Sequence, residues 1–225
     1  MSILTLYHGS KKIISVPDED LSEDFNDFGA GFYLTESFDA AQQWACTKGA
    51  DGFVNKYEIE TEDLVIIDLC GEEYNILNWL YVVMGSRKYR ISDVSFEKSL
   101  TYLKQNFPVN ISGADIIKGL RADEAYFFIA KAFLKGRISL SQLKKLMDAG
   151  PAGEQVALKS REAFRRLSFV SFEGTDAAFA NPRRKKRNDA VLEAYFAAEA
   201  TADEEGLYIS DMIGQEIRND DERIQ

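Results

Sequence analysis

The chain has 225 residues, of which 45% are hydrophobic and 28% charged, and its formal net charge is −10. This length can bury a full core, and the composition is that of a globular protein rather than a disordered one. The negative charge disfavours nucleic acid and anionic lipid as partners, and no apolar run approaches the ~20 residues of a membrane span. We therefore expect no stable nucleic-acid complex and no membrane association.

The N-terminal residues and the cysteines indicate where in the cell the protein is expected. The N-terminus lacks the basic segment and apolar core of a secretory signal, so we expect a cytoplasmic protein, or one delivered from a cytoplasm as an effector. Cys46 and Cys70 both fall in segments predicted to pack, which favours two buried, reduced thiols over a disulfide. One histidine and two cysteines offer no zinc site, and we predict no metal.

The N-terminal third is predicted to contain short strands and one helix. Residues 3–10 and 31–35 are β-prone, and the acidic stretch between them is typical of an irregular loop. A helix is expected after Ser37, which can cap it. Residues 52–60 alternate with period two, as in a half-buried strand, and the apolar run 63–71 is predicted to be a central strand.

The middle of the chain is predicted to be mainly helical. One apolar stripe at offsets of four, three and four marks the clearest helix: Phe96, Leu100, Leu103 and Phe107. A short strand at 114–119 leads to a helical hairpin over 123–150, where Asp123 and Glu124 suit a helix N-terminus. Strands at 154–160 and 167–173 follow. Strands thus begin and end this part of the chain with helices between them, which indicates an α+β fold.

The composition changes after residue 173. We predict one domain over 1–173, followed by a basic linker and a C-terminal helical extension over 174–225 that can pack on the same domain. Five consecutive basic residues, Arg183 to Arg187, could bind nucleic acid or act in targeting. No aromatic residue interleaves with them and acidic segments surround them, which favours a solvated linker.

Three short segments are the best candidates for chemistry, because phosphate-loop, GxSxG and HExxH motifs are absent. They are "LYHGS" at Leu6–Ser10, "DFGAGFYLT" at Asp27–Thr35 and "GEQVALKS" at Gly153–Ser160. Each places a polar or aromatic group beside glycine, where a ligand can approach the backbone closely. Taken alone, these aromatic and polar residues could equally be structural parts of strands.

Together with "ADIIKGLRADE" at Ala114–Glu124, these segments resemble the ADP-ribosyltransferase superfamily, in its His-Tyr-Glu branch of diphtheria toxin and the poly(ADP-ribose) polymerases. More closely, the chain is similar to a bacterial family of unknown function assigned to that superfamily. The resemblance covers roughly the first three-quarters of the chain. It implies split β-sheets with a central NAD cleft and inserted helices.

The resemblance further implies a NAD-dependent mono-ADP-ribosyltransferase, toxin-like or regulatory, with NAD as its substrate. Such an enzyme cleaves the nicotinamide–ribose bond and transfers ADP-ribose to a protein, nucleotide or small-molecule acceptor. His8 would hydrogen-bond a ribose hydroxyl, Gly9 would face the nicotinamide amide through its backbone, and Ser10 would steady that amide. Tyr33 would stack on the nicotinamide ring and exclude water.

The third position of the family pattern, where a carboxylate would stabilise the positive charge that develops on the ribose, falls on Gln155. Gln155 can hold a hydroxyl but carries no charge. Its neighbour Glu154 is charged, but adjacent residues of a strand point to opposite faces unless Gly153 permits a bulge. Both residues stay open as the catalytic group. A glutamine there argues against chain elongation and favours the alternative function, a weak or inactive module that binds NAD or ADP-ribose and acts through protein interactions.

Overall fold

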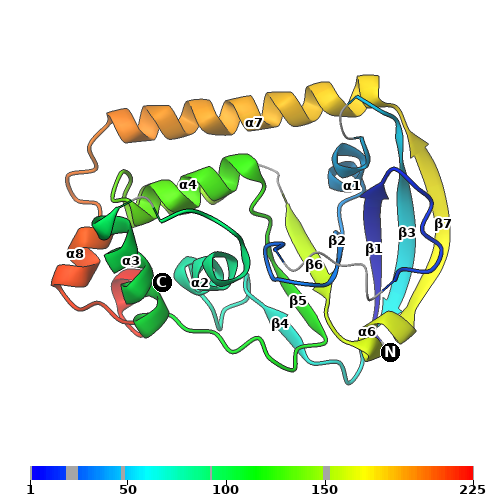
Figure 1. The fold of residues 1–225 in the computed structure, drawn as a ribbon, viewed down its shortest axis with the longest axis horizontal. Helices are drawn as coiled ribbons and strands as arrows, with labels where there is room; N and C mark the ends of the chain where they lie inside the picture. The colour runs from blue at the N-terminus through cyan, green and yellow to red at the C-terminus, as the bar shows by residue number, and fades with distance from the viewer. Residues whose placement is uncertain (1, 19–24, 47–48, 92, 149–152, 225) are drawn as a thin grey trace.

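The computed structural model describes residues 2–18, 25–46, 49–91, 93–148 and 153–224. It contains two β-sheets and a layer of helices, so the α+β prediction is confirmed (Figure 1). The first sheet has the antiparallel order β1 (Ile3–Ser10), β3 (Gly52–Glu60), β7 (Leu167–Thr175). The second sheet has the order β2 (Phe32–Leu34), β6 (Glu154–Leu158), β5 (Ile116–Leu120), β4 (Ile66–Asp68), and only its β4–β5 pair is parallel.

The helices occupy the segments between and after these strands. They are α1 (Phe38–Ala45), α2 (Ile76–Ser86), α3 (Val94–Asn106), α4 (Glu124–Leu134), α5 (Leu140–Asp148), α6 (Arg161–Arg166), α7 (Ala177–Ala200), α8 (Ile209–Gly214) and a 3₁₀ turn (Glu222–Ile224). The Ser37 hydroxyl caps α1 by accepting from the Ala40 N–H at 3.2 Å, as predicted. The predicted stripe on α3 is buried in the helical core, and α4 begins at Glu124 after its cap Asp123.

The second sheet separates two cores. Val156 and Leu158 of β6 belong to the core between the two sheets, whereas Ala157 belongs to the core under the helices. This alternation is the ordinary pleat of a strand, in which successive side chains point to opposite faces. Glu154 and Gln155, at the start of β6, therefore begin on opposite sides of the sheet.

Strands β1 and β2 join the two sheets. Tyr7 donates its N–H to the Thr35 carbonyl at 2.8 Å and accepts the Thr35 N–H at 2.9 Å. Thr35 directly follows β2, and Figure 1 shows β1 and β2 side by side at this junction. His8 follows Tyr7, so the only histidine of the chain lies where the two sheets meet.

The apolar run predicted as a central strand forms the edge strand β4 instead. Among the described strands it pairs with β5 alone, and Val65 and Ile66 are 55% and 44% exposed. The run is apolar because Leu69 and Ile67 pack against the helical core. Such packing requires that only one face of the strand be covered, as at the edge of a sheet. Cys70 lies in the turn after β4 and is exposed, so the prediction of buried thiols is correct for Cys46 and wrong for Cys70; both are free thiols.

The basic run predicted as a solvated linker is also different in the structure. It lies inside α7, which runs along one side of the molecule from the sheets to the helical layer (Figure 1). Arg187 is only 7% exposed, and Arg184 donates to the carbonyl oxygens of Gln43 and Cys46 at 3.2 and 3.0 Å. The linker prediction is wrong because these arginines find carbonyl and carboxylate partners on neighbouring helices.

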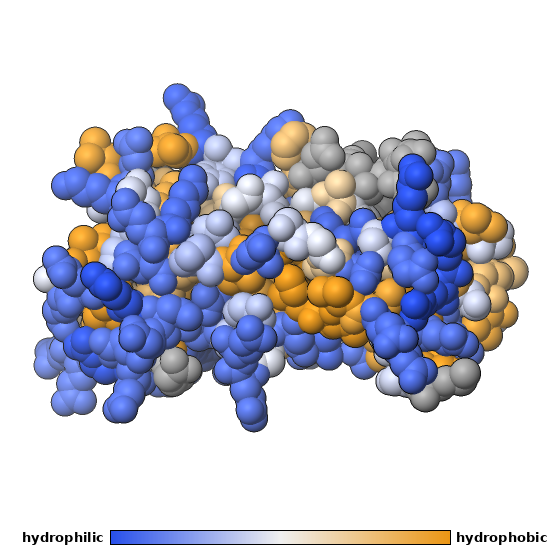
Figure 2. Space-filling model, turned by 90° about the horizontal axis from the view of Figure 1, so that it is seen from below, coloured by the Kyte–Doolittle hydropathy of each residue, from blue (hydrophilic) through white to orange (hydrophobic). Residues whose placement is uncertain are grey.

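The surface carries apolar as well as charged groups. Figure 2 shows one face on which a central patch of hydrophobic side chains has hydrophilic side chains on either side. Elsewhere, Phe172 of β7 is 51% exposed and Phe179 of α7 is 56% exposed. Such exposure is common in folded proteins and does not by itself indicate a partner. None of the described helices combines the length and apolar character needed to cross a bilayer.

Candidate functional site

Three candidate residues that are far apart in the sequence line one cavity. His8 from β1, Tyr33 from β2 and Gln155 from β6 surround a space of about 220 Å³, here named the His8 cavity. The remaining lining residues are Asn26, Asp27, Trp44, Arg87, Arg121, Ala122 and Asp123. The cavity thus lies at the junction of the two sheets, where β1 meets β2.

The His8 imidazole is held in one tautomer. Its Nδ1 lies 2.7 Å from the Tyr33 carbonyl oxygen, and because a carbonyl only accepts, Nδ1 carries the proton. Burial lowers the pKa of His8, although the bond to the Tyr33 carbonyl opposes this shift, so the ring is neutral at pH 7. Nε2 is then an acceptor, which can receive a hydrogen bond from a ligand hydroxyl.

The Tyr33 hydroxyl is bound by the preceding loop. It accepts from the Phe28 N–H at 2.9 Å and donates to the Gly29 carbonyl at 2.7 Å. Gly29 has φ +77°, a conformation that glycine adopts without strain, and this allows the loop to turn back over the ring. Burial raises the pKa of Tyr33, so the hydroxyl stays protonated. With the hydroxyl engaged, the aromatic ring is the part of Tyr33 available to a ligand.

Gln155 is 4% exposed, and its orientation is set by a carboxylate. Its Nε2 donates to Oδ2 of Asp27 at 2.6 Å, so Oε1 remains as an acceptor. The same Asp27 oxygen accepts the Ala122 N–H at 2.8 Å, and Oδ1 pairs with Arg87 at 3.0 Å. Burial raises the pKa of Asp27, while Arg87, the Ala122 N–H and Gln155 oppose the shift. A buried carboxylate therefore lies directly behind the neutral amide.

Glu154 does not line the His8 cavity. Its carboxylate pairs with Lys118 at 2.9 Å, and Lys118 also contacts Glu36 at 3.0 Å. These groups line a second space of about 530 Å³, named the Glu154 cavity. The β5–β6 register is continuous through Glu154 and Gln155, so Gly153 introduces no bulge that would turn Glu154 inward. Of the two candidates for the third position, the structure brings only Gln155 to His8 and Tyr33.

Gly9 and Ser10 lie beside the His8 cavity without lining it. A Cβ at Gly9 would lie 2.0 Å from the Ala41 carbonyl oxygen, so packing of α1 on β1 already requires glycine there. The N–H and C=O of Tyr7 point toward β2, where they bond Thr35. The N–H and C=O of Gly9, two residues along the strand, point to the same side. The Ser10 hydroxyl donates to the Lys12 carbonyl and accepts from Asn55 Nδ2 at 3.2 Å, so the protein itself engages it.

Arg121 and Trp44 are among the residues of the His8 cavity that sequence reasoning missed. The Arg121 guanidinium stacks 4.2 Å above the Trp44 ring. Arg121 Nη1 and Trp44 Nε1 are buried, and neither has a hydrogen bond to the described residues. Burial lowers the pKa of Arg121 to about 10, so the group remains a cation at pH 7. The available signal was the place of Arg121, a charged residue directly after a buried strand.

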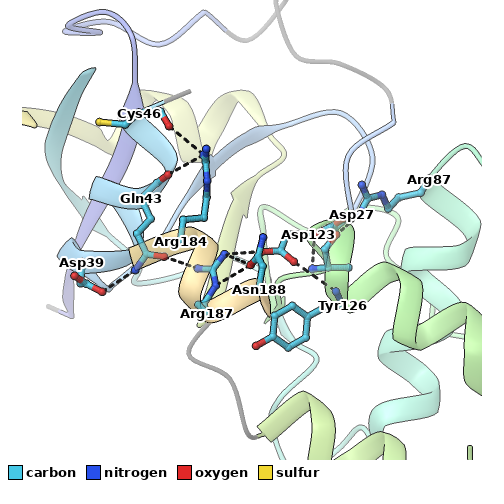
Figure 3. Close-up of polar contacts among 11 residues, drawn as sticks. Asp27, Asp39, Gln43, Cys46, Arg87, Asp123, Tyr126, Arg184, Arg187 and Asn188 are labelled. Carbon is cyan, nitrogen blue, oxygen red and sulfur yellow. Dashed lines mark hydrogen bonds and ion pairs between the residues drawn. The ribbon is translucent and has the colours of Figure 1, made fainter. Parts of the chain in front are cut away.

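Helix α7 carries Arg187, which pairs with Asp123 of the cavity wall (Figure 3). Arg187 donates to Asp123 at 2.7 Å and to the Gln43 side chain at 2.9 Å. Gln43 in turn donates to Asp39 at 2.9 Å, so polar contacts connect α1, α7 and the start of α4. Both side chains of the Arg187–Asp123 pair are largely buried, at 5% and 12% exposure. Such a pair is costly to break, because the remaining charge has no partner.

The comparisons place the chain in a family without a known activity. A model of the family described as "Protein of unknown function (DUF3990)" matches residues 4–169, so the chain belongs to that family. No curated protein and no solved structure matches the chain. Within the described residues, no group of three His, Cys, Asp or Glu side chains could hold a metal ion. Any functional conclusion therefore depends on the geometry of the His8 cavity.

Proposed function

We propose that this member of the family is a NAD-dependent mono-ADP-ribosyltransferase, whose two sheets are the split sheets of that fold. The observation that carries the proposal is the meeting of His8, Tyr33 and Gln155 on one cavity. A neutral imidazole acceptor suits a ribose hydroxyl, an aromatic ring suits nicotinamide, and an amide oxygen suits a second ribose hydroxyl. The backbone of Gly9, on the β2 side of β1, would face the nicotinamide amide.

The proposed reaction breaks the bond between nicotinamide and the anomeric carbon, and the bonding electron pair leaves with nicotinamide. Positive charge develops on the ribose until a nucleophilic atom of the acceptor attacks that carbon and loses its proton. Gln155 would position a ribose hydroxyl through Oε1. The carboxylate of Asp27, 2.6 Å from the Gln155 amide nitrogen, would supply negative charge that stabilises the transition state more than the substrate.

The sizes of the two cavities indicate how a dinucleotide would lie. The His8 cavity, at about 220 Å³, is smaller than the roughly 300–1,000 Å³ of common ligand sites. It suits the nicotinamide and its ribose rather than a whole dinucleotide. Arg121 also lines the Glu154 cavity of about 530 Å³, so the two spaces share this side chain. The rest of the ligand would extend from Arg121 toward that larger space.

One observation favours a second candidate, a module that binds NAD or ADP-ribose without turnover. Gln155 is neutral, and the nearest carboxylate, Asp27, is itself paired with Arg87 at 3.0 Å. This pairing reduces the negative charge that the ribose would experience. Following nicotinamide release from labelled NAD separates the two candidates, because binding without release supports the module and release supports the transferase.

Binding is tested first by thermal shift with NAD and with nicotinamide. A ligand that binds only the folded state at 100 times its Kd stabilises it by about 2.7 kcal/mol. Millimolar NAD should therefore raise the Tm, and His8→Ala or Tyr33→Ala should each remove the shift. Tyr33→Phe keeps the ring and should retain most of it. A folded protein whose Tm does not respond to millimolar NAD would contradict both candidates.

A further inference from the structure

Two buried donors at the His8 cavity have no acceptor among the residues that the structure describes. Arg121 Nη1 and Trp44 Nε1 form no hydrogen bond with the described residues, and both side chains line the cavity. Stacking at 4.2 Å holds the guanidinium over the indole but satisfies none of its N–H groups. Leaving a buried donor unsatisfied is costly, and more so when the donor is charged. Two such donors on neighbouring side chains point to an acceptor that a ligand would bring.

The charges around the cavity indicate that this acceptor is an anion. Asp27 is paired with Arg87 at 3.0 Å, and Asp123 is paired with Arg187 at 2.7 Å. Arg121 has no ion pair with any described carboxylate, so these two acidic groups face three guanidinium groups. An excess of positive charge thus surrounds the His8 cavity in a chain whose net charge is −10. A neutral acceptor would satisfy the donors but leave this charge uncompensated.

The chemistry and place of Arg121 select a phosphate among the possible anions. A guanidinium presents its N–H groups in a planar fork that matches phosphate oxygens. Arg121 lines both cavities, so it stands where a dinucleotide would pass from its nicotinamide end to the remainder. In a dinucleotide that connecting part is the pyrophosphate.

We infer that Arg121 and Trp44 form a pyrophosphate subsite that binds the phosphate groups of the dinucleotide between the two cavities. The inference rests on the proposed function for the identity of the whole ligand. The phosphate chemistry of the subsite is shared by ADP-ribose and by inorganic pyrophosphate. These two probes therefore test the subsite separately from nicotinamide.

The experiment is calorimetric titration of the full chain with ADP-ribose, inorganic pyrophosphate and nicotinamide at low and high salt. The two phosphate probes should bind, and more weakly at high salt. Arg121→Gln should weaken both by about 10-fold or more, and leave nicotinamide within about 2-fold. Trp44→Phe keeps an aromatic ring under the guanidinium but removes Nε1–H, so a smaller loss of about 3- to 10-fold is expected. The exposed Arg90→Gln is the matched control and should change nothing.

The subsite is wrong if neither phosphate probe binds the wild-type chain, or if both bind Arg121→Gln as tightly as wild type. Failure of the proposed function has a different signature: nicotinamide does not bind and is not released from NAD, while phosphate binding still depends on Arg121. Circular dichroism checks the fold of each variant. If Arg121→Gln does not fold, phosphate binding by Arg121→Lys and Trp44→Phe tests the subsite instead. The lysine keeps the charge without the fork, so intermediate binding of the phosphate probes is expected.

Discussion

Gln155 and Glu154 are neighbours on β6, yet they occupy different environments. Gln155 is 4% exposed and bonds a buried carboxylate in the His8 cavity. The Glu154 side chain is 43% exposed and bonds Lys118 in the Glu154 cavity. Strand alternation alone produces this division, because the register of β6 is continuous. The comparison shows that the charged residue of the pair is the one that the fold directs away from His8 and Tyr33.

The two cavities also differ in how their charges are held. The Lys118–Glu154 pair is partly exposed, and ion pairs of that kind contribute about 0–1 kcal/mol. The walls of the His8 cavity contain Asp123, which pairs with the buried Arg187 behind it, and the buried Asp27 carboxylate. Disturbing a group there leaves another charge without its partner. We therefore expect substitutions around the His8 cavity to have the larger effects.

The largest effect is expected from Arg187→Ala. It leaves the Asp123 carboxylate buried without its guanidinium, which should lower the free energy of unfolding by about 3–5 kcal/mol. Arg183→Ala is the matched control from the same helix, because Arg183 pairs with Asp39 at an exposed position and its loss should cost under about 1 kcal/mol. Urea unfolding measures both. Equal losses for the two variants would show that burial does not distinguish these contacts.

The next effect concerns Gln155→Ala and Glu154→Ala, compared by the rate of nicotinamide release from NAD. If the proposed function is correct, Gln155→Ala removes the group that holds the reacting ribose and should slow release by about 100-fold or more. Removing Glu154, which bonds Lys118 away from His8, should change the rate by less than about 3-fold. If Glu154→Ala produced the greater loss, the assignment of the two cavities would be reversed.

The smallest effect is a pH dependence that belongs to His8. Its pKa in the folded state lies below the unfolded value of about 6.5, so the unfolded state binds the proton first. The contribution of the neutral His8 ring to the free energy of unfolding is therefore fully present above pH 6.5. It is lost as the pH falls through the folded pKa, by at most about 1.4 kcal/mol per pH unit.

His8 is the only histidine, so subtracting the curve of His8→Gln from that of wild type isolates this contribution. Denaturant unfolding at pH 7.5, 6.5 and 5.5 provides the curves. Asp27, whose pKa burial raises, is present in both proteins and cancels in the difference. A difference that grows in favour of the wild type at low pH would contradict a buried, neutral imidazole.

Local patterns in the sequence predicted several elements of the fold, including the strands that carry His8 and Gln155. The β-prone run around His8, the strand around Gln155 and the helical stripe that includes Phe96 and Leu100 all follow from short-range periodicity. The same reasoning predicted that Glu154 and Gln155 point apart. The position of β4 was not predictable in this way, because periodicity does not show how many neighbours a strand has.

The residues that complete the His8 cavity could not be predicted because their partners are distant in the sequence. Asp27 and Gln155 are hydrogen-bonded although 128 positions separate them in the sequence, and 144 positions separate the bonded pair Arg187 and Gln43. The basic run has the composition of an exposed segment, and only the packing of α7 against α1 shows that Arg187 is buried. Charge composition predicts solvation well only where no opposite charge is brought near by the fold.

The reach of α7 has a practical consequence for handling this protein. The segment matched by the family model ends at residue 169, whereas the guanidinium that neutralises Asp123 comes from position 187. A fragment trimmed to the matched segment would lack α7, so one side of α1 would be exposed. The Asp123 carboxylate would lose its partner Arg187. A piece for crystallisation or assay must extend beyond α7 to Ile224, because Ile209, Met212, Ile217 and Ile224 are buried in the helical core.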